Sequence, residues 1–262
     1  MSNLNKEQAR AVNTINGPCL CLAGPGSGKT FTIVERIRHM IEDEGISPSE
    51  ILVITFSNKS AEEMKHRFYR MAGNVNYPVY FGTFHAIFYS MVKRYYHLSN
   101  ESILQEKDKL RILNNILLKN GISDVDNYHK RELIQNFALY KMALYSKQDN
   151  EELLFIENKG QFLSLYKQYT DFCKKEKKLD FDDMLYICSD LLHKNKDILD
   201  YYKGIYKYIL VDEFQDVNDV QYDVLMLLAG ESRNVFVVGD ISIVDKIRRI
   251  KRGAYYSCEK VA

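Results

Sequence analysis

An apolar run, a glycine-rich turn and a helical pattern follow one another near the start of this chain. Residues 19–23 are small or apolar, and Ile33, Ile37 and Met40 recur at helical spacing beyond the turn. The turn between them is Ala23-Gly24-Pro25-Gly26-Ser27-Gly28-Lys29-Thr30. Glycines allow backbone N–H groups to turn inward around an anion, and the N-terminus of the next helix adds partial positive charge. The arrangement predicts an α/β fold with a parallel sheet and a phosphate-binding loop.

Two side chains at the end of this turn have the chemistry that a bound triphosphate needs. Lys29 would contact the β- and γ-phosphates, and the Thr30 hydroxyl would bind Mg²⁺. The strict loop pattern begins with glycine, whereas this chain has Ala23. The alternative is a glycine-rich turn that ends by chance in lysine and threonine, which the flanking strand and helix disfavour.

A second apolar run, at 208–211, ends in an acidic pair. A phosphate-binding loop needs a carboxylate on a nearby strand to hold Mg²⁺ and a base to position water. Asp212 suits the first role and Glu213 the second. An acidic pair alone is common, but here it is extended into Asp212-Glu213-Phe214-Gln215-Asp216, which is far more specific.

Further strands and helices alternate through the first part of the chain. Apolar runs at 51–55 and 79–81 predict two more strands. Asn5 and Asn58 are expected to cap the helices that follow them, the second of which ends at about Met71. This βα alternation predicts a parallel sheet flanked by helices.

The middle of the chain, from about 93 to 193, has no evident strand. Its apolar residues recur at helical spacing instead: Leu110, Leu113, Ile116 and Leu117; Leu133, Phe137 and Tyr140; Phe162, Leu165, Tyr166 and Tyr169. The sheet pattern resumes at 208–211, and 235–238 is expected to be the final strand. The order predicts an all-helical insertion within an α/β domain.

Composition narrows the class of protein only slightly. The 262 residues are 46% apolar and 27% charged, which suits one large soluble domain or two modest ones. A net charge of +1 carries no nucleic-acid signal. The five cysteines form no zinc-type pair, so we expect reduced thiols and a cytoplasmic protein. No apolar stretch approaches the roughly 18 residues of a membrane span, and none is expected.

These motifs together resemble the N-terminal half of superfamily 1 DNA helicases of the UvrD/Rep/PcrA type. Besides the phosphate-binding loop, five segments occur in the family's order over nearly the whole chain. They are Leu4-Asn5-Lys6-Glu7-Gln8, similar to the glutamine motif; Val53-Ile54-Thr55-Phe56-Ser57-Asn58-Lys59-Ser60-Ala61, similar to motif Ia; Gly82-Thr83-Phe84-His85, similar to motif Ib; Leu179-Asp180-Phe181-Asp182-Asp183-Met184-Leu185, similar to the end of the helical insertion; and Val211-Asp212-Glu213-Phe214-Gln215-Asp216-Val217-Asn218, similar to motif II.

The resemblance implies a split architecture and a set of nucleotide contacts. A RecA-like ATP-binding domain would comprise 1–92 and 186–262, with a helical subdomain at 93–185. Gln8 would hydrogen-bond the adenine and favour ATP over GTP. Gln215 would link the nucleotide site to the nucleic-acid site.

The resemblance also implies a path for single-stranded DNA, or for DNA with a single-stranded tail. Phe56 would stack on a base without reading sequence. Thr55, Asn58, Thr83 and His85 would contact the DNA backbone. Three of these residues have plainer interpretations: Phe56 as a core residue, Asn58 as a helix cap only, and His85 as a residue of a helix start.

The chain departs from the family pattern at two places. Phe31 stands where the family usually has arginine, near the triphosphate. Residues 241–254 replace a motif III that normally carries a glutamine and an aromatic side chain, and 246–252 hold five basic residues in seven. That basic stretch is either a substitute phosphate contact or a frayed tail.

The sequence therefore predicts an ATP-binding and single-stranded-DNA-binding N-terminal fragment of a 3′-to-5′ helicase. The arginines that a second RecA-like domain would bring to the γ-phosphate are not encoded in these 262 residues, so little motor activity is expected of this chain alone. The alternatives are a non-catalytic nucleotide- or DNA-binding module, and a phosphate-loop kinase or switch protein.

Overall fold

The computed structural model describes residues 4–24, 26–146, 158–180, 183–240 and 256–261. It divides into two compact units, one formed by 1–87 with 189–262 and the other by 88–188. The limits fall within helices α4 (Phe84–Tyr96) and α8 (Asp183–Lys194). Pro25, residues 181–182 and the altered segment 241–254 lie outside the described residues.

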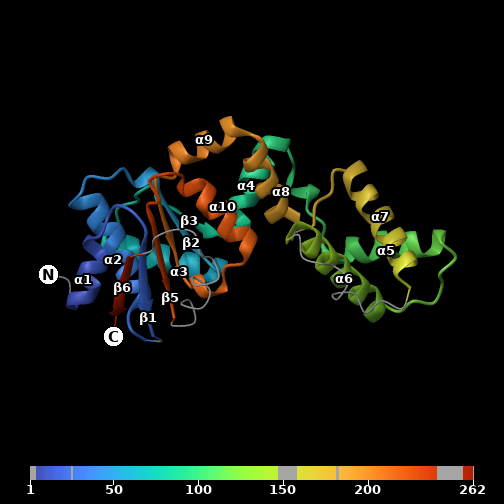
Figure 1. The fold of residues 1–262 in the computed structure, drawn as a ribbon, viewed down its shortest axis with the longest axis horizontal. Helices are drawn as coiled ribbons and strands as arrows, with labels where there is room; N and C mark the ends of the chain where they lie inside the picture. The colour runs from blue at the N-terminus through green and yellow to red at the C-terminus, as the bar shows by residue number, and fades with distance from the viewer. Residues whose placement is uncertain (1–3, 25, 147–157, 181–182, 241–255, 262) are drawn as a thin grey trace. The chain divides into compact units, whose positions relative to one another are not determined.

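The first unit contains a parallel sheet with the strand order β3-β2-β4-β5-β1-β6. The neighbouring strands β5, β1 and β6 can be followed in Figure 1. The strands are β1 (Cys19–Ala23), β2 (Ile51–Thr55), β3 (Tyr80–Thr83), β4 (Tyr208–Val211), β5 (Val235–Gly239) and β6 (Tyr256–Val261). Strand β4 lies between β2 and β5, although a long helical stretch of chain separates it from β2. The predicted fold class, a RecA-like parallel α/β sheet flanked by helices, is confirmed.

One strand was not expected from the sequence. The predicted strand at 235–238 is confirmed as β5, but it is not the final strand, because β6 follows it and pairs in parallel with the outer edge of β1. Tyr256, Ser257, Cys258 and Glu259 alternate between apolar and polar types, a strand signal that the sequence analysis did not use.

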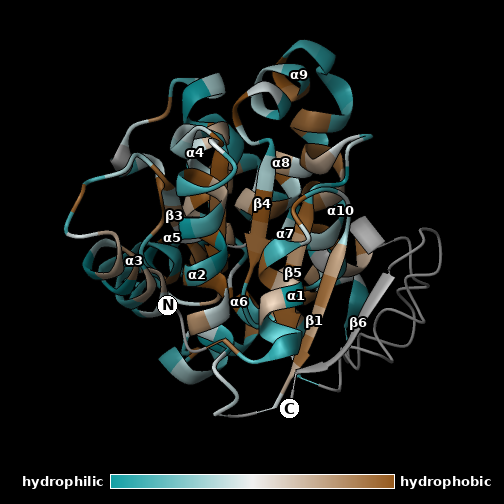
Figure 2. Cartoon of the chain, turned by 90° about the vertical axis from the view of Figure 1, so that its left-hand side faces the viewer, coloured by the Kyte–Doolittle hydropathy of each residue, from teal (hydrophilic) through white to brown (hydrophobic). Residues whose placement is uncertain are grey.

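Helices α1 (Lys6–Asn13), α2 (Lys29–Glu42) and α3 (Asn58–Met71) bury one face of the sheet. Alternate strand residues, such as Val53, Leu210 and Phe236, share one core with residues of these helices. Their neighbours Ile54 and Val211 are buried as well, so the strands are apolar on both sides, as expected for a parallel sheet. Figure 2 shows this as brown strands beneath helices with teal outer surfaces.

This unit also contains the first residues of α4, the last residues of α8, and the helices α9 (Lys196–Ile205) and α10 (Asp219–Ala229). In the described parts of the chain, three short 3₁₀ helices occur, at Pro48–Glu50, Asn100–Ser102 and Phe214–Asp216. No helix among the described residues is both long and apolar enough to cross a membrane.

The second unit has its own helical core. Helices α5 (Glu106–Lys119), α6 (Asn127–Ser146) and α7 (Lys159–Lys175) pack around a cluster that includes Leu113, Phe137 and Phe162. The residues predicted from helical spacing supply most of this cluster. Within the described part of this unit, β-type pairing is limited to an isolated bridge between Ile103 and Leu179.

Side-chain caps define the starts of several helices, and one of them corrects the sequence prediction. Asn5 caps α1, as expected, and it does so through a capping box with Gln8 that the sequence analysis did not foresee. Asn58, however, is the first residue of α3 and not its cap. Ser57 has the extended backbone of a cap residue, and its side chain accepts a hydrogen bond from the Ser60 amide at 3.1 Å.

This correction predicts different costs for two adjacent substitutions. Ser57→Ala removes the acceptor of the Ser60 amide, so we expect it to lower the free energy of unfolding by about 1 kcal/mol. Asn58→Ala leaves that bond intact and should change the free energy of unfolding by less than about 0.5 kcal/mol. Urea denaturation followed by circular dichroism measures both. A larger loss for Asn58→Ala than for Ser57→Ala would contradict the assignment.

Candidate functional site

Parallel pairing brings the carboxyl ends of the strands to one edge of the sheet. The segments that leave this edge are the glycine-rich loop after β1, Phe56 after β2, Phe84 after β3, Asp212 after β4 and Asp240 after β5. Residues that are far apart in the sequence therefore gather at one place.

The loop after β1 has the backbone of an anion-binding turn. Gly26 and Gly28 have φ angles of 75° and 88°, a region that side chains other than glycine rarely adopt. A Cβ atom on Gly28 would also lie 3.1 Å from Nε2 of Gln8. The Ser27 hydroxyl donates to the Gly24 carbonyl at 2.7 Å and closes the turn. Lys29 and Thr30 follow as the first residues of α2.

Gln8 is buried against this loop from α1. Its Nε2 donates to the Ser27 carbonyl at 3.1 Å, and its Oε1 accepts from the Asn5 amide at 3.0 Å. The capping box therefore determines which end of the side-chain amide is oxygen and which is nitrogen.

Lys29 and Glu213 meet at the loop although 184 positions separate them. The Lys29 Nζ lies 2.8 Å from Oε2 of Glu213. The same oxygen accepts a 2.6 Å hydrogen bond from Nε2 of Gln215. The Gln215 Oε1 in turn accepts from the Asp240 amide at 3.3 Å. A polar chain thus links the loop after β1 with the segments after β4 and β5.

The two adjacent carboxylates have opposite pKa shifts. Burial, and then the charge of Glu213, raise the pKa of Asp212 to about 6. Burial also acts to raise the pKa of Glu213, but hydrogen bonds from Gln215 and Lys29 and the charge of Lys29 outweigh it, so its pKa is lowered. Glu213 is therefore ionised at neutral pH, whereas Asp212 holds a desolvated charge that a cation would stabilise.

Asp212 and Thr30 are the residues at this edge that could hold a metal ion together with a bound phosphate. Among the residues that the structure describes, no three His, Cys, Asp or Glu side chains cluster as a metal cage would require. Mg²⁺ commonly takes one or two protein ligands and completes its shell with phosphate oxygens and water. The buried Asp212 carboxylate, 8% exposed, and the Thr30 hydroxyl fit that pattern.

The residues predicted to contact DNA lie at the ends of two paired strands. Thr55 and Thr83 are register partners in β2 and β3. Phe56 is 65% exposed, so the alternative that it is a core residue is wrong. Asn58 is exposed at the start of α3, and His85 is the half-buried second residue of α4.

The two threonine hydroxyls have structural bonds of their own. Thr55 is buried, and its hydroxyl donates to the Ser57 carbonyl at 2.9 Å. The Thr83 hydroxyl accepts from the Ala86 amide at 3.2 Å in the first turn of α4. Phe56 and Asn58 therefore offer more accessible surface to a ligand than Thr55 and Thr83.

Comparison with known proteins identifies the family. A family model described as the UvrD/REP helicase N-terminal domain matches residues 4–242. The chain belongs to the UvrD/REP helicase family. It is 32% identical over 244 residues to the ATP-dependent DNA helicase PcrA of Staphylococcus epidermidis strain RP62A, and equally to that of Staphylococcus aureus strain NCTC 8325. Each match covers 92% of this chain and 33% of the relative, so the chain spans about a third of their length.

Two polar residues of this helicase domain were not singled out from the sequence. Asp240 follows β5, and its amide completes the chain from Lys29 through Glu213 and Gln215. Arg36 is buried in α2 between Ile33 and Ile37. A charged residue on the apolar stripe of a helix is the signal that would have pointed to it.

The raised pKa of Asp212 predicts that its charge costs stability in this helicase domain. A carboxyl group whose pKa is higher in the folded state stabilises the fold below its unfolded pKa, and this contribution is lost as the pH rises through about 6. Asp212→Asn keeps an acceptor for the Glu213 amide and has no charge to bury. Without Mg²⁺, we expect it to raise the free energy of unfolding by about 2 kcal/mol at pH 8, and by roughly half as much at pH 5.

Urea denaturation at both pH values measures this difference. Asp216→Asn removes an exposed carboxylate four positions along and should change the free energy of unfolding by less than about 0.5 kcal/mol. Equal or lower stability of Asp212→Asn at pH 8 would show that the Asp212 charge is not destabilising.

Proposed function

We propose that this domain binds ATP and Mg²⁺ at the carboxyl edge of its sheet and holds single-stranded DNA beside them, as part of an ATP-dependent 3′-to-5′ DNA helicase. The observation that carries the proposal is the meeting of Lys29, Glu213 and Gln215 at the glycine-rich loop. Membership of the helicase family supports the reaction class. The 3′-to-5′ polarity rests on the resemblance to UvrD/Rep/PcrA-type helicases.

The phosphates are proposed to lie in the loop formed by Ala23, Gly24, Pro25, Gly26, Ser27 and Gly28. The left-handed backbone of Gly26 and Gly28 and the N-terminus of α2 favour an anion at this place. Lys29 then contacts the β- and γ-phosphates. This requires its ammonium group to be shared between the phosphates and Glu213, or to leave Glu213 for them.

The adenine is proposed to be recognised by Gln8. One N–H of its amide is used by Ser27, and one lone pair of its oxygen is used by Asn5. One N–H and one lone pair then remain, because a side-chain amide has two of each. Adenine presents an N–H donor beside a ring-nitrogen acceptor, whereas guanine presents two acceptors on that edge. The remaining groups of Gln8 therefore match adenine and favour ATP over GTP.

Mg²⁺ is proposed to be held by Asp212 and Thr30, together with phosphate oxygens. When bound, it would offset negative charge on the phosphates. Its positive charge would also stabilise the ionised form of Asp212, whose pKa burial raises to about 6.

Glu213 is proposed to orient the attacking water and accept its proton. Its lowered pKa keeps it ionised at neutral pH, which an acceptor for that proton requires. The water oxygen forms a bond to the γ-phosphorus, the bond to the β–γ bridging oxygen breaks, and ADP and phosphate are the products. Gln215 holds Glu213 on one side and the Asp240 amide on the other. Gln215 is thereby proposed to couple ATP binding and hydrolysis to the positions of the neighbouring strand ends.

Single-stranded DNA is proposed to cross the ends of β2 and β3. Phe56 offers an exposed ring on which any base can stack. Asn58 is the first residue of α3, which follows β2, and His85 is the second residue of α4, which follows the paired strand β3. Thr55 and Thr83 are proposed to contact the DNA backbone together with them. DNA with a single-stranded tail is proposed to bind in the same way.

Motor activity is proposed to need a second RecA-like domain, so ATP turnover by these 262 residues alone is expected to be slow.

Loss of the Lys29 ammonium group tests the nucleotide site. Lys29→Ala removes a charge-assisted contact to phosphate, so we expect the affinity for ATP with Mg²⁺ to fall about 10- to 150-fold. Isothermal titration calorimetry measures it, with Lys194→Ala on the exposed surface of α8 as the control that should bind as the wild type does. Equal affinities for the wild type and Lys29→Ala would refute the proposed site.

Removal of the Phe56 ring tests the DNA path. Because stacking contributes about 1–3 kcal/mol per base, Phe56→Ala should weaken binding of a fluorescent oligo(dT) about 5- to 150-fold. Binding should also weaken with salt and be similar for oligonucleotides of different sequence. Tyr201→Ala, which removes an exposed ring from α9, should have no such effect. Unchanged binding by Phe56→Ala, or a sharp sequence preference, would count against the proposal.

A further inference from the structure

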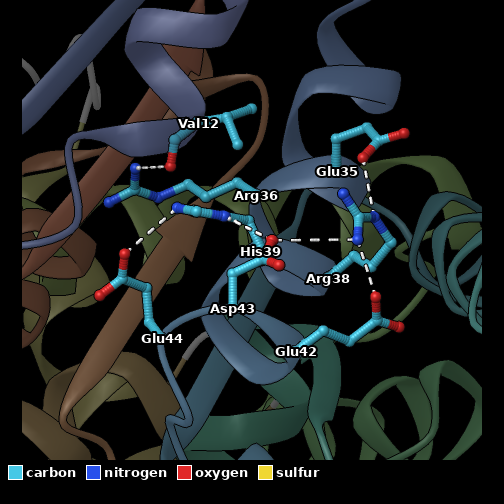
Figure 3. A network of polar contacts seen from close by, with 8 residues as sticks. All are labelled: Val12, Glu35, Arg36, Arg38, His39, Glu42, Asp43 and Glu44. Carbon is cyan, nitrogen blue, oxygen red and sulfur yellow. Dashed lines mark hydrogen bonds and ion pairs between the residues drawn. The ribbon is translucent and has the colours of Figure 1, made fainter. Parts of the chain in front are cut away.

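A buried guanidinium group joins helices α1 and α2. Arg36 of α2 is only 2% exposed, and Figure 3 shows its side chain directed at the backbone near Val12. Its Nη1 donates to the carbonyls of Ala11 at 2.6 Å and Val12 at 3.3 Å, and its Nη2 donates to that of Ile15 at 3.2 Å. The guanidinium carbon also lies 4.4 Å from the centre of the Phe236 ring in β5.

The setting of Arg36 differs from that of the other charged residues in Figure 3. Arg38 lies two positions further along α2 and is partly exposed, and it pairs with the carboxylates of Glu35 and Glu42 at 3.0 and 2.7 Å. Arg36 instead donates to three main-chain carbonyls. A buried charge is costly unless its donors are well placed, and the planar fork of arginine can serve several acceptors at once.

These carbonyls belong to the C-terminal end of α1 and the residues just beyond it. Helix α1 ends at Asn13, and the last carbonyls of a helix have no partner within the helix. A cation at this end also interacts favourably with the helix dipole. Arg36 therefore holds the end of α1 against α2.

The other end of α1 carries Gln8. Its Nε2 contacts the Ser27 carbonyl of the loop at 3.1 Å, and α2 begins directly after that loop. An eight-residue helix is thus held to the loop at its start and to the following helix at its end. A Cβ atom on Gly28 would lie 3.1 Å from the Gln8 Nε2, so a side chain at this loop position would press on the Gln8 amide.

We propose that Arg36 is a positioning residue for adenine recognition, because it holds α1 in the place from which Gln8 meets the base. This inference rests on the proposed role of Gln8 in ATP binding. Arg36 itself lies in the core and would not touch the nucleotide. Its loss would let α1 shift against α2, and the amide of Gln8 would no longer present its remaining donor and acceptor to adenine at a defined distance.

The ratio of the affinities for ATP and GTP tests the proposal. Isothermal titration calorimetry with Mg²⁺ would compare the wild-type chain with Gln8→Ala, Arg36→Lys and the double variant. Arg36→Lys keeps the charge but replaces the fork by one ammonium group, whose three donors leave a single nitrogen and cannot reproduce the separate positions of Nη1 and Nη2. We expect Gln8→Ala to remove a preference of about 5- to 150-fold, and Arg36→Lys to remove much of it. In the Gln8→Ala background, Arg36→Lys should change the ratio no further.

A matched control and a second variant keep the test decisive. Arg38→Lys makes the same chemical change on the same helix at a partly exposed position, and it should leave the ratio as in the wild type. Thermal unfolding followed by circular dichroism establishes that each variant is folded. Should Arg36→Lys not fold, Phe236→Leu removes the ring beneath the guanidinium group and should lower the ratio by a smaller factor.

Three results would overturn the inference, and they separate it from the proposed function. If the wild type shows no preference for ATP, the role of Gln8 is wrong and the inference falls with it. If Gln8→Ala loses the preference and folded Arg36→Lys binds both nucleotides as the wild type does, only the role of Arg36 is wrong. If Arg36→Lys weakens ATP and GTP binding by the same factor, Arg36 stabilises the fold without positioning Gln8.

Discussion

The parallel pairing of β4 with both β2 and β5 is the constraint on which the rest of the first unit depends. Strand β4 enters the sheet after the whole helical unit has intervened, and it joins the β2–β3 pair to the β5–β1 pair. The Asp212 amide continues this pairing by donating to the Ile54 carbonyl at 2.9 Å. The acidic pair Asp212-Glu213 therefore lies at the carboxyl edge of the sheet, beside the glycine-rich loop. This position allows Glu213 to form its ion pair with Lys29.

Environment gives two adjacent carboxylates different chemistry at this edge. Asp212 is buried at the strand end, and its pKa is raised to about 6. Glu213 has a left-handed backbone, with a φ of 49°, which is uncommon for a residue with a side chain. It accepts bonds from Lys29 and Gln215, and its pKa is lowered. Because their pKa values are shifted in opposite directions, the two carboxylates are suited to different roles: Asp212 to binding a cation and Glu213 to accepting a proton.

Two glutamines connect the candidate site to the rest of the sheet unit. Gln8 contacts the loop from α1, whose far end Arg36 holds against α2. Gln215 joins Glu213 to the backbone at the end of β5. Both amides donate through nitrogen and accept through oxygen, so each can transmit a small displacement between elements. Under the function proposed above, these two links would connect the nucleotide site with the neighbouring helix and strand ends.

The sequence by itself determined the elements whose signal is local. The apolar runs at 19–23, 51–55 and 208–211 became strands, and the helical spacing around Phe137 marked a second core, because side-chain periodicity decides which face of an element is buried. Tertiary structure alone decided which of the adjacent residues Ser57 and Asn58 caps α3, because the cap depends on where the backbone leaves β2. It also decided that β6 occupies the edge of β1 and that Arg36 lies inside. These depend on contacts between segments far apart in the chain, which no local pattern encodes.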